Sequence, residues 1–157
     1  MKKITVTLFL FFLFVGISWA EEKIFVDIFL APERRADVPM IKERFANFSI
    51  KKVQPQFFRK GNPPMNIAVG SNISADVARL VIDTAITYNR GVTHLMPQFR
   101  FHPHQIAIGT SAFDELVPVA ISPEALEQLK NPALSTVEFH QLYRRLTKEK
   151  PKLEPNH

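Results

Sequence analysis

The chain has 157 residues, contains no cysteine and carries a formal net charge of +5 at pH 7. Without cysteine it cannot be a disulfide-stabilised scaffold, and it lacks the residue to which a bacterial lipid anchor is usually attached. The length suits one domain of ordinary size with its own hydrophobic core.

Residues 1–20 have the features of a secretory signal peptide. Two lysines after the initial methionine precede an apolar run over residues 4–17, and the triplet Ser-Trp-Ala at residues 18–20 supplies small residues for cleavage. The apolar run is too short to cross roughly 30 Å of hydrocarbon comfortably as a helix. We therefore expect cleavage after Ala20 and a periplasmic or secreted product without a transmembrane segment.

The first half of the remaining chain predicts strands separated by one short helix and by turns. β-forming residues mark the strands, and the proline and glycine residues after residue 54 are typical of turns. The predicted elements are, in chain order, a strand over residues 23–30, a helix from Asp37 to about residue 47, a strand over residues 48–53, turns over residues 54–64 and a strand over residues 65–69.

The second half contains the clearest helix. Ser74 is placed as its N-cap, Asp76 lies in its first turn, where a carboxylate favours the helix dipole, and Gly91 ends it. The later elements are a strand over residues 92–96, an extended arm over 97–104, a strand over 105–108, a helix over 123–130 capped by Ser122, and a last helix opened by the capping box of Ser135 and Glu138.

These elements predict an α/β (α+β) fold. We expect a single small domain over residues 21–147, with a mixed or antiparallel sheet of about four to five strands and helices packed on it. Residues 148–157 form a polar tail that we expect to be disordered.

A six-residue sequence pattern occurs twice in similar form. Residues 67–72 (IAVGSN) are echoed at residues 106–111 (IAIGTS), and each copy reads as a buried strand that runs into glycine and polar turn residues. Two interpretations stay open: two similar strand ends in one sheet, or a sharper one, in which the chain has a duplicated α/β half or paired anion sites at the turns. Neither copy contains a nucleotide-binding glycine fingerprint.

The order strand, Gly-Ser, helix, two strands and Gly-Thr over residues 65–130 resembles the sporulation-related repeat (SPOR) modules of bacterial envelope proteins. Those modules carry two strands of this type, each followed by a helix. The resemblance implies a ferredoxin-like sheet that binds the glycan strands of peptidoglycan.

Positive charge is concentrated in the middle of the chain. The cations there are Arg44, Lys51, Lys52, Arg59, Lys60, Arg79, Arg90 and Arg100, against the acids Asp76 and Asp83. A field of this kind favours anionic partners, although an ordinary basic surface gives the same pattern. The predicted binding loops interleave aromatic and basic residues, namely Phe57, Phe58, Arg59, Lys60, Phe99, Arg100, Phe101, His102 and His104.

The histidines His94, His102 and His104 are weak candidates for metal ligands. No cysteine accompanies them, no acid lies between Asp83 and Asp114, and a proline separates the last two histidines. No G-x-S-x-G motif or cysteine nucleophile is present, and the adjacent acids Asp114 and Glu115 make a poor catalytic pair on a strand.

The sequence thus predicts an exported, non-catalytic binding or accessory protein of the bacterial cell envelope that needs no cofactor. Its expected partner is an envelope protein or a peptidoglycan-like anionic polymer, and the export signal argues against nucleic acid. The alternative is a small metal-dependent enzyme or metal-binding protein of the periplasm that uses the three histidines.

Overall fold

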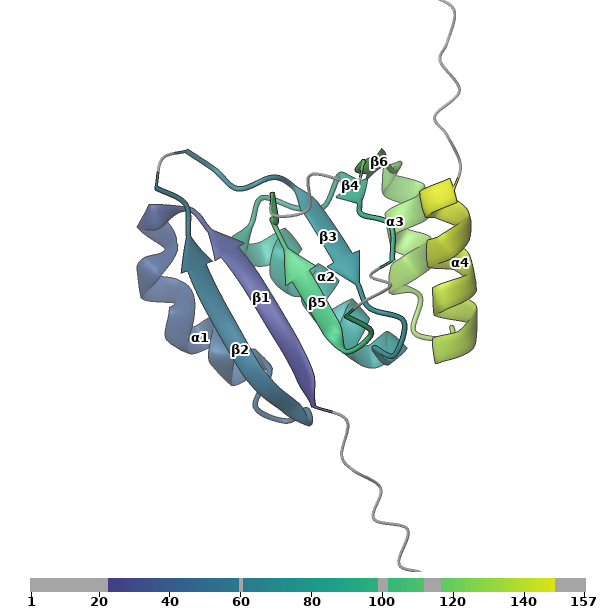
Figure 1. Cartoon of the computed structure of the whole chain (residues 1–157), viewed down its shortest axis with the longest axis horizontal. Helices are drawn as coiled ribbons and strands as arrows, with labels where there is room; N and C mark the ends of the chain where they lie inside the picture. The colour runs from purple at the N-terminus through teal and green to yellow at the C-terminus, as the bar shows by residue number, and fades with distance from the viewer. Residues whose placement is uncertain (1–22, 60, 99–101, 112–116, 149–157) are drawn as a thin grey trace, which may run out of the picture.

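The computed structural model describes residues 23–59, 61–98, 102–111 and 117–148 (Figure 1). The predicted signal peptide and almost all of the predicted polar tail lie outside these residues. Within them, six strands form one mixed sheet in the order β2-β1-β5-β3-β4-β6. The strands are β1 (Ile24–Leu30), β2 (Ile50–Phe57), β3 (Asn66–Val69), β4 (His94–Leu95), β5 (Gln105–Ile108) and β6 (Val119–Ala120).

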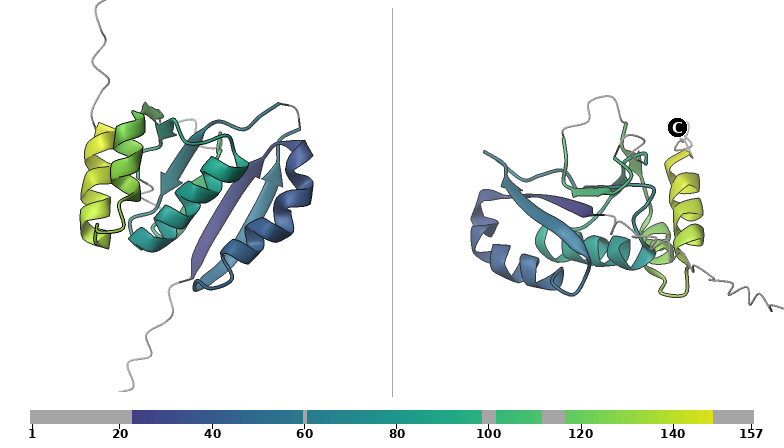
Figure 2. Two further views of the ribbon diagram at one scale, coloured as in Figure 1. Left: turned by 180° about the vertical axis from the view of Figure 1, so that it is seen from behind. Right: turned by 60° about the horizontal axis from the view of Figure 1, so that its bottom comes forward.

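The helices accompany the sheet on one face and at one end. They are the 3-10 helix η1 (Pro32–Asp37) and the α-helices α1 (Val38–Arg44), α2 (Ala75–Tyr88), α3 (Pro123–Lys130) and α4 (Thr136–Lys148). Helices α1 and α2 lie on the same face of the sheet, while α3 and α4 stand side by side at the end where β4 and β6 lie (Figures 1 and 2). The prediction of a single small α+β domain with a mixed sheet is confirmed.

Strand pairing defines two edges of the sheet. Strands β1, β2 and β5 are parallel to one another, and β3 runs antiparallel to β5. The carboxyl ends of β1, β2 and β5 therefore meet the amino ends of β3 and β4 on one side. We call that side the carboxyl edge, and we call the opposite side, where β1 and β5 begin and β3 ends, the amino edge.

The core lies between the sheet and α2. In β1, Val26, Ile28 and Leu30 are fully buried, because alternate side chains of a strand point to one face. The apolar face of α2 packs against them, through residues that include Val81 and Ile82.

Helix α4 closes the end of this core. Phe139 and Tyr143 are fully buried, and the Tyr143 hydroxyl lies 2.7 Å from the carbonyl oxygen of Met96 and 3.1 Å from that of Ile67. Phe139, Leu142 and Tyr143 are spaced so that they share one face of α4, and this face is the buried one.

Three predicted helix starts are confirmed by their hydrogen bonds. The Ser74 hydroxyl accepts from the amide of Val77 at 3.3 Å, and the Ser122 hydroxyl accepts from that of Ala125 at 3.2 Å. In the capping box, the Glu138 amide donates to the Ser135 hydroxyl at 3.3 Å, and the Ser135 amide donates to the Glu138 carboxylate at 2.9 Å.

The predicted cap at Asp37 is wrong. The residues before it form η1, so the chain is already helical there, and the Asp37 carboxylate accepts from Arg34 at 3.1 Å instead of capping α1.

The predicted turn over residues 54–57 is also wrong, because β2 continues to Phe57 through Pro55. Strand β2 is an edge strand, so one side of its backbone faces solvent. The Phe58 amide donates to the Leu30 carbonyl oxygen at 3.0 Å, and counting back in steps of two leaves Pro55 on the solvent side. The missing N–H of Pro55 therefore removes no bond to β1.

Two further differences concern β4 and β6. The predicted strand over residues 92–96 is shorter, and Val119–Ala120 pairs with it although no strand was predicted there. Strands β3 and β4, which flank α2, are adjacent and parallel. A split βαβ unit would place another strand between them, so this connection differs from the ferredoxin-like sheet that the SPOR resemblance implies.

No helix among the described residues has the length and apolar character needed to cross a membrane.

Candidate functional site

Unusual backbone conformations collect at the carboxyl edge. Among the described residues, positive φ angles occur at Gly61 (75°), Arg90 (64°), Gly91 (109°) and Gly109 (67°). Gly61 belongs to the loop between β2 and β3, the next two follow α2, and Gly109 follows β5, so all four lie in loops at this edge. Arg90 differs from the other three because it is not glycine. L side chains rarely adopt positive φ angles, and residues with a strained backbone cluster at functional sites.

Buried amide side chains tie these loops together. The side chain of Asn66 donates to the carbonyl oxygen of Thr110 at 3.0 Å and accepts from the amide of Thr110 at 3.0 Å. The side chain of Asn89 donates to the carbonyl oxygen of Pro64 at 3.2 Å. Both asparagines are at least 95% buried, so these bonds are protected from water and fix the positions of the loops.

Gly109 lies where the loops meet. A Cβ atom at this position would come within 2.7 Å of the Asn89 side-chain nitrogen, 2.9 Å of the Pro63 Cβ and 3.1 Å of the Phe29 carbonyl oxygen. Both its positive φ and this close approach require glycine.

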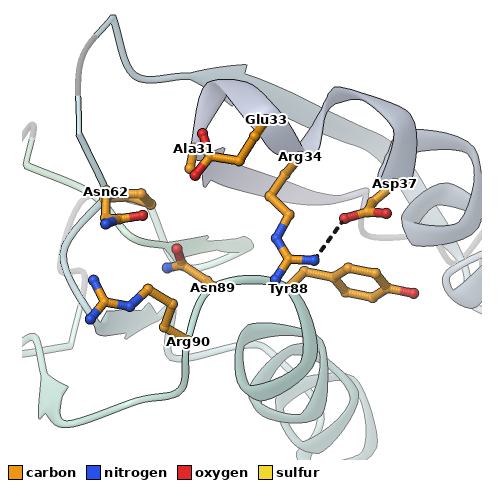
Figure 3. A pocket seen from close by; sticks show the side chains of 9 residues that line it. Ala31, Glu33, Arg34, Asp37, Asn62, Tyr88, Asn89 and Arg90 are labelled. Atoms are coloured by element: carbon orange, nitrogen blue, oxygen red, sulfur yellow. Dashed lines mark hydrogen bonds and ion pairs between the residues drawn. The ribbon is translucent and has the colours of Figure 1, made fainter.

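Two adjoining hollows open between the loops, and we refer to them together as the groove. The first has a volume of about 340 Å³ and is lined by side chains that include Glu33, Arg34, Asp37, Asn62, Tyr88 and Arg90 (Figure 3). The second, of about 550 Å³, is lined by residues that include Pro64, Met65, Thr93, His94 and Pro118. Asn62, Pro63 and Arg90 line both hollows, so the two hollows adjoin at these residues along the carboxyl edge.

Some charged side chains of the groove form ion pairs with other described residues and others do not. The Arg34 guanidinium pairs with the Asp37 carboxylate at 3.1 Å. The Arg90 side chain is exposed and has no hydrogen-bonding or ionic partner among the described residues. Figure 3 shows Glu33 and Arg34 on the η1 side of the groove and Asn62 and Arg90 opposite them. Arg90 is therefore the cation of this groove that is available to a ligand.

The described part of the predicted loop, residues 57–59, also lies at this edge. Arg35 stacks over the ring of Phe57 at 4.6 Å, and Phe58 makes an edge-to-face contact with Phe29 at 6.2 Å. Arg59 is exposed. The two aromatic rings thus anchor the loop to the protein.

The remaining predicted binding residues are either outside the described residues or at the amino edge. Lys60, Phe99, Arg100 and Phe101 fall outside the described residues. His102 and His104 precede β5 at the amino edge, where the His104 carbonyl oxygen accepts from the Phe25 amide at 3.0 Å. The structure therefore does not bring residues 57–59 together with His102 and His104.

The three histidines named as weak candidates for metal ligands do not come together. His94 lies at the carboxyl edge with its Nδ1 2.9 Å from the Thr93 hydroxyl, whereas His102 and His104 are at the opposite edge. No group of three His, Cys, Asp or Glu within the described residues could hold a metal ion. Pairing direction is the reason, because His94 opens β4 at the edge where β5 ends.

Sequence reasoning missed Asn62, Asn89 and Arg90 as site residues. The predicted helix runs up to Gly91 and so includes Arg90, yet Arg90 lies two residues beyond the last helical residue, Tyr88. The available signal was the Asn-Arg-Gly sequence at the helix end, where asparagine and glycine are typical of left-handed termini.

Comparisons of the chain with protein-family models, with curated proteins and with solved structures find no significant match.

Proposed function

We propose that this chain is an exported binding or accessory protein of the bacterial cell envelope, and that the carboxyl-edge groove engages an anionic group of its partner. The observation that carries the proposal is Arg90, a charged side chain without an intramolecular partner among the described residues, held on a left-handed backbone at the centre of the groove. The partner is an envelope protein or a peptidoglycan-like anionic polymer.

The chemistry of the groove supports an anionic ligand. A guanidinium offers a planar fork of donors that matches a carboxylate or phosphate. Asn62 lies beside it in both hollows and adds an amide that can donate and accept. Because the loops beneath are fixed by buried hydrogen bonds, binding requires little ordering of the backbone.

A retention assay with a charge-matched control tests this proposal. Purified protein is incubated with peptidoglycan sacculi and, separately, with immobilised poly-L-glutamate at low and high salt. Arg90→Gln removes a cation from the groove, and Arg145→Gln removes one from the exposed basic side of α4, where Arg144, Arg145 and Lys148 line another hollow.

We expect the wild-type protein to be retained by at least one of the two anions at low salt and released at high salt. Arg90→Gln should reduce retention at least fivefold, while Arg145→Gln should leave it nearly unchanged. Equal losses in both variants, or no retention of the wild type, would contradict the proposal.

A further inference from the structure

The groove is elongated, and its two ends differ in charge. Glu33, Arg34 and Asp37 line only the η1 end, and His94 lines only the end near β4. Arg90 lies in the part that both hollows share. A ligand that occupies both hollows is therefore an extended chain that passes Arg90.

The charge pattern distinguishes among extended ligands. At the η1 end, Asp37 already pairs with Arg34, and the exposed Glu33 has no ionic partner among the described residues. A polyanion with a charge on every repeat would bring one of its charges against Glu33, and like charges at an interface are unfavourable. A chain with one negative charge at Arg90 and a neutral or positive group near Glu33 fits both ends.

The wall beyond Arg90 favours side chains of a peptide. Pro64 and Pro118 present rigid apolar surface there, and Met65 adds a flexible apolar side chain, while Pro63 beneath them is buried. An aliphatic side chain next to the acidic residue would bury apolar area on this wall at little entropic cost to the protein. The Asn62 amide can bond to the backbone of an extended peptide.

From this geometry we propose that the groove binds an extended peptide segment of a partner protein, with an acidic side chain on Arg90 and an aliphatic side chain on the wall formed by Pro64 and Met65. The proposal rests on the proposed function, since it assigns the ligand of the same groove. This mode of binding is the recognition of an acidic motif by arginine, with rigid loops holding the arginine in place.

Fluorescence anisotropy with defined probes tests the proposal. The first probe is a fluorescein-labelled hexapeptide with one glutamate, a leucine on one side of it and a lysine on the other, and its reversed sequence covers the opposite direction of binding. The comparison probes are the same peptides with glutamine in place of glutamate, hexaglutamate, and a galacturonate hexamer. Arg145→Gln again serves as the charge-matched control.

We expect one direction of the single-glutamate peptide to bind, and its affinity to fall at least tenfold when glutamate becomes glutamine. Arg90→Gln should cause the same loss, and the two changes together should lose little more, because they remove one shared contact. Met65→Ser should weaken binding a few-fold. Glu33→Gln should improve the binding of hexaglutamate more than that of the single-glutamate peptide.

The outcomes separate this proposal from the proposed function. If the galacturonate hexamer or sacculi bind in an Arg90-dependent manner while neither single-glutamate peptide binds, the peptide assignment is wrong and the anion-binding function stands. If no anion binds in an Arg90-dependent manner, both are wrong. Peptide binding that is equally sensitive to Arg145→Gln would also overturn the assignment.

Discussion

The two edges of the sheet are built in opposite ways. At the amino edge, backbone and capping groups pair with one another: the amide of Ala75, the first residue of α2, donates to the Thr136 hydroxyl at 3.1 Å, and the Asn72 amide donates to the Pro103 carbonyl oxygen at 2.9 Å. At the carboxyl edge, positive-φ loops surround a groove whose central cation has no partner among the described residues. The amino edge is thus closed by hydrogen bonds within the protein, whereas the carboxyl edge has a groove that is open to a ligand.

The pairing of β3 with β5 decides between the two interpretations of the repeated sequence pattern. Its copies form β3 and β5, which are antiparallel neighbours with Ala68 opposite Ala107. Their glycines, Gly70 and Gly109, therefore lie at opposite edges, and the turns cannot form paired anion sites. The interpretation as two similar strand ends in one sheet is confirmed.

The largest effect on stability is expected at Gly109. Gly109→Ala places a side chain on a left-handed backbone and against atoms of three neighbouring segments, so we expect a loss of roughly 2–4 kcal/mol in the free energy of unfolding. Gly61→Ala is the control, because its φ is 75° but nothing lies within 4 Å of the added Cβ. It should cost only about 1 kcal/mol in urea denaturation. Similar losses in the two variants would refute the contact at Gly109.

At the amino edge, Gly70→Ala should be destabilising for a different reason. Its Cβ would approach the carbonyl oxygens of Pro103 and His102 to 2.3 and 2.6 Å, so backbone must move, at a cost of about 1–3 kcal/mol. Under conditions where the variant is folded, Arg90-dependent retention by anions should be unchanged, since the groove lies at the other edge. Loss of retention in a folded Gly70→Ala protein would contradict the separation of the two edges.

Tyr143→Phe is expected to have a smaller effect. Burial raises the pKa of the Tyr143 hydroxyl, which therefore remains protonated and donates to the backbone carbonyl oxygens beside β3 and β4. Removing it leaves buried carbonyl groups with one donor fewer and should cost about 1–2 kcal/mol. Chemical denaturation measures this loss, and an unchanged midpoint and slope would show that the hydroxyl does not stabilise the fold.

The prediction for His140 concerns pH. Its Nε2 lies 2.7 Å from the Ile73 carbonyl oxygen and its Nδ1 lies 2.6 Å from the Gln98 side-chain nitrogen, an arrangement that suits a neutral ring with the proton on Nε2. Burial lowers the pKa of His140 below its ordinary value of 6.5, and the neighbouring Arg144 lowers the pKa further, while the bond to Ile73 opposes both.

Because the unfolded chain then takes up a proton before the folded protein does, the free energy of unfolding should decrease as the pH falls from about 7.5 through 6.5, until the folded pKa is reached. Denaturation at several pH values should show this decrease in the wild type and in a His102→Gln control, but a weaker one in His140→Gln. The same pH dependence in all three proteins would count against the assignment.

The sequence predicted what is determined locally. Caps at Ser74, Ser122 and Ser135 depend on side chains that reach amides three residues away, and those spacings are visible in one chain. The buried face of α4 follows from its periodicity in the same way. Pro55 misled the prediction of β2, since only knowledge that the strand lies at an edge explains why proline is tolerated there.

The candidate site could not be predicted in the same way. Its residues come from segments around positions 33, 62, 90 and 94, which are brought together by the order and direction of the strands. Nothing in the local pattern shows that β5 lies between β1 and β3 or that β3 runs against it. For the same reason, the separation of His94 from His102 and His104 required the strand pairing.

The most direct test of the account is Arg90→Gly, measured for both stability and binding. If Arg90 serves a partner rather than the fold, glycine should relieve the left-handed conformation, so the free energy of unfolding should stay equal or rise by up to about 1 kcal/mol. Retention by sacculi or poly-L-glutamate should be lost in the same protein. A clearly destabilised variant, or one that binds anions as the wild type does, would contradict the account.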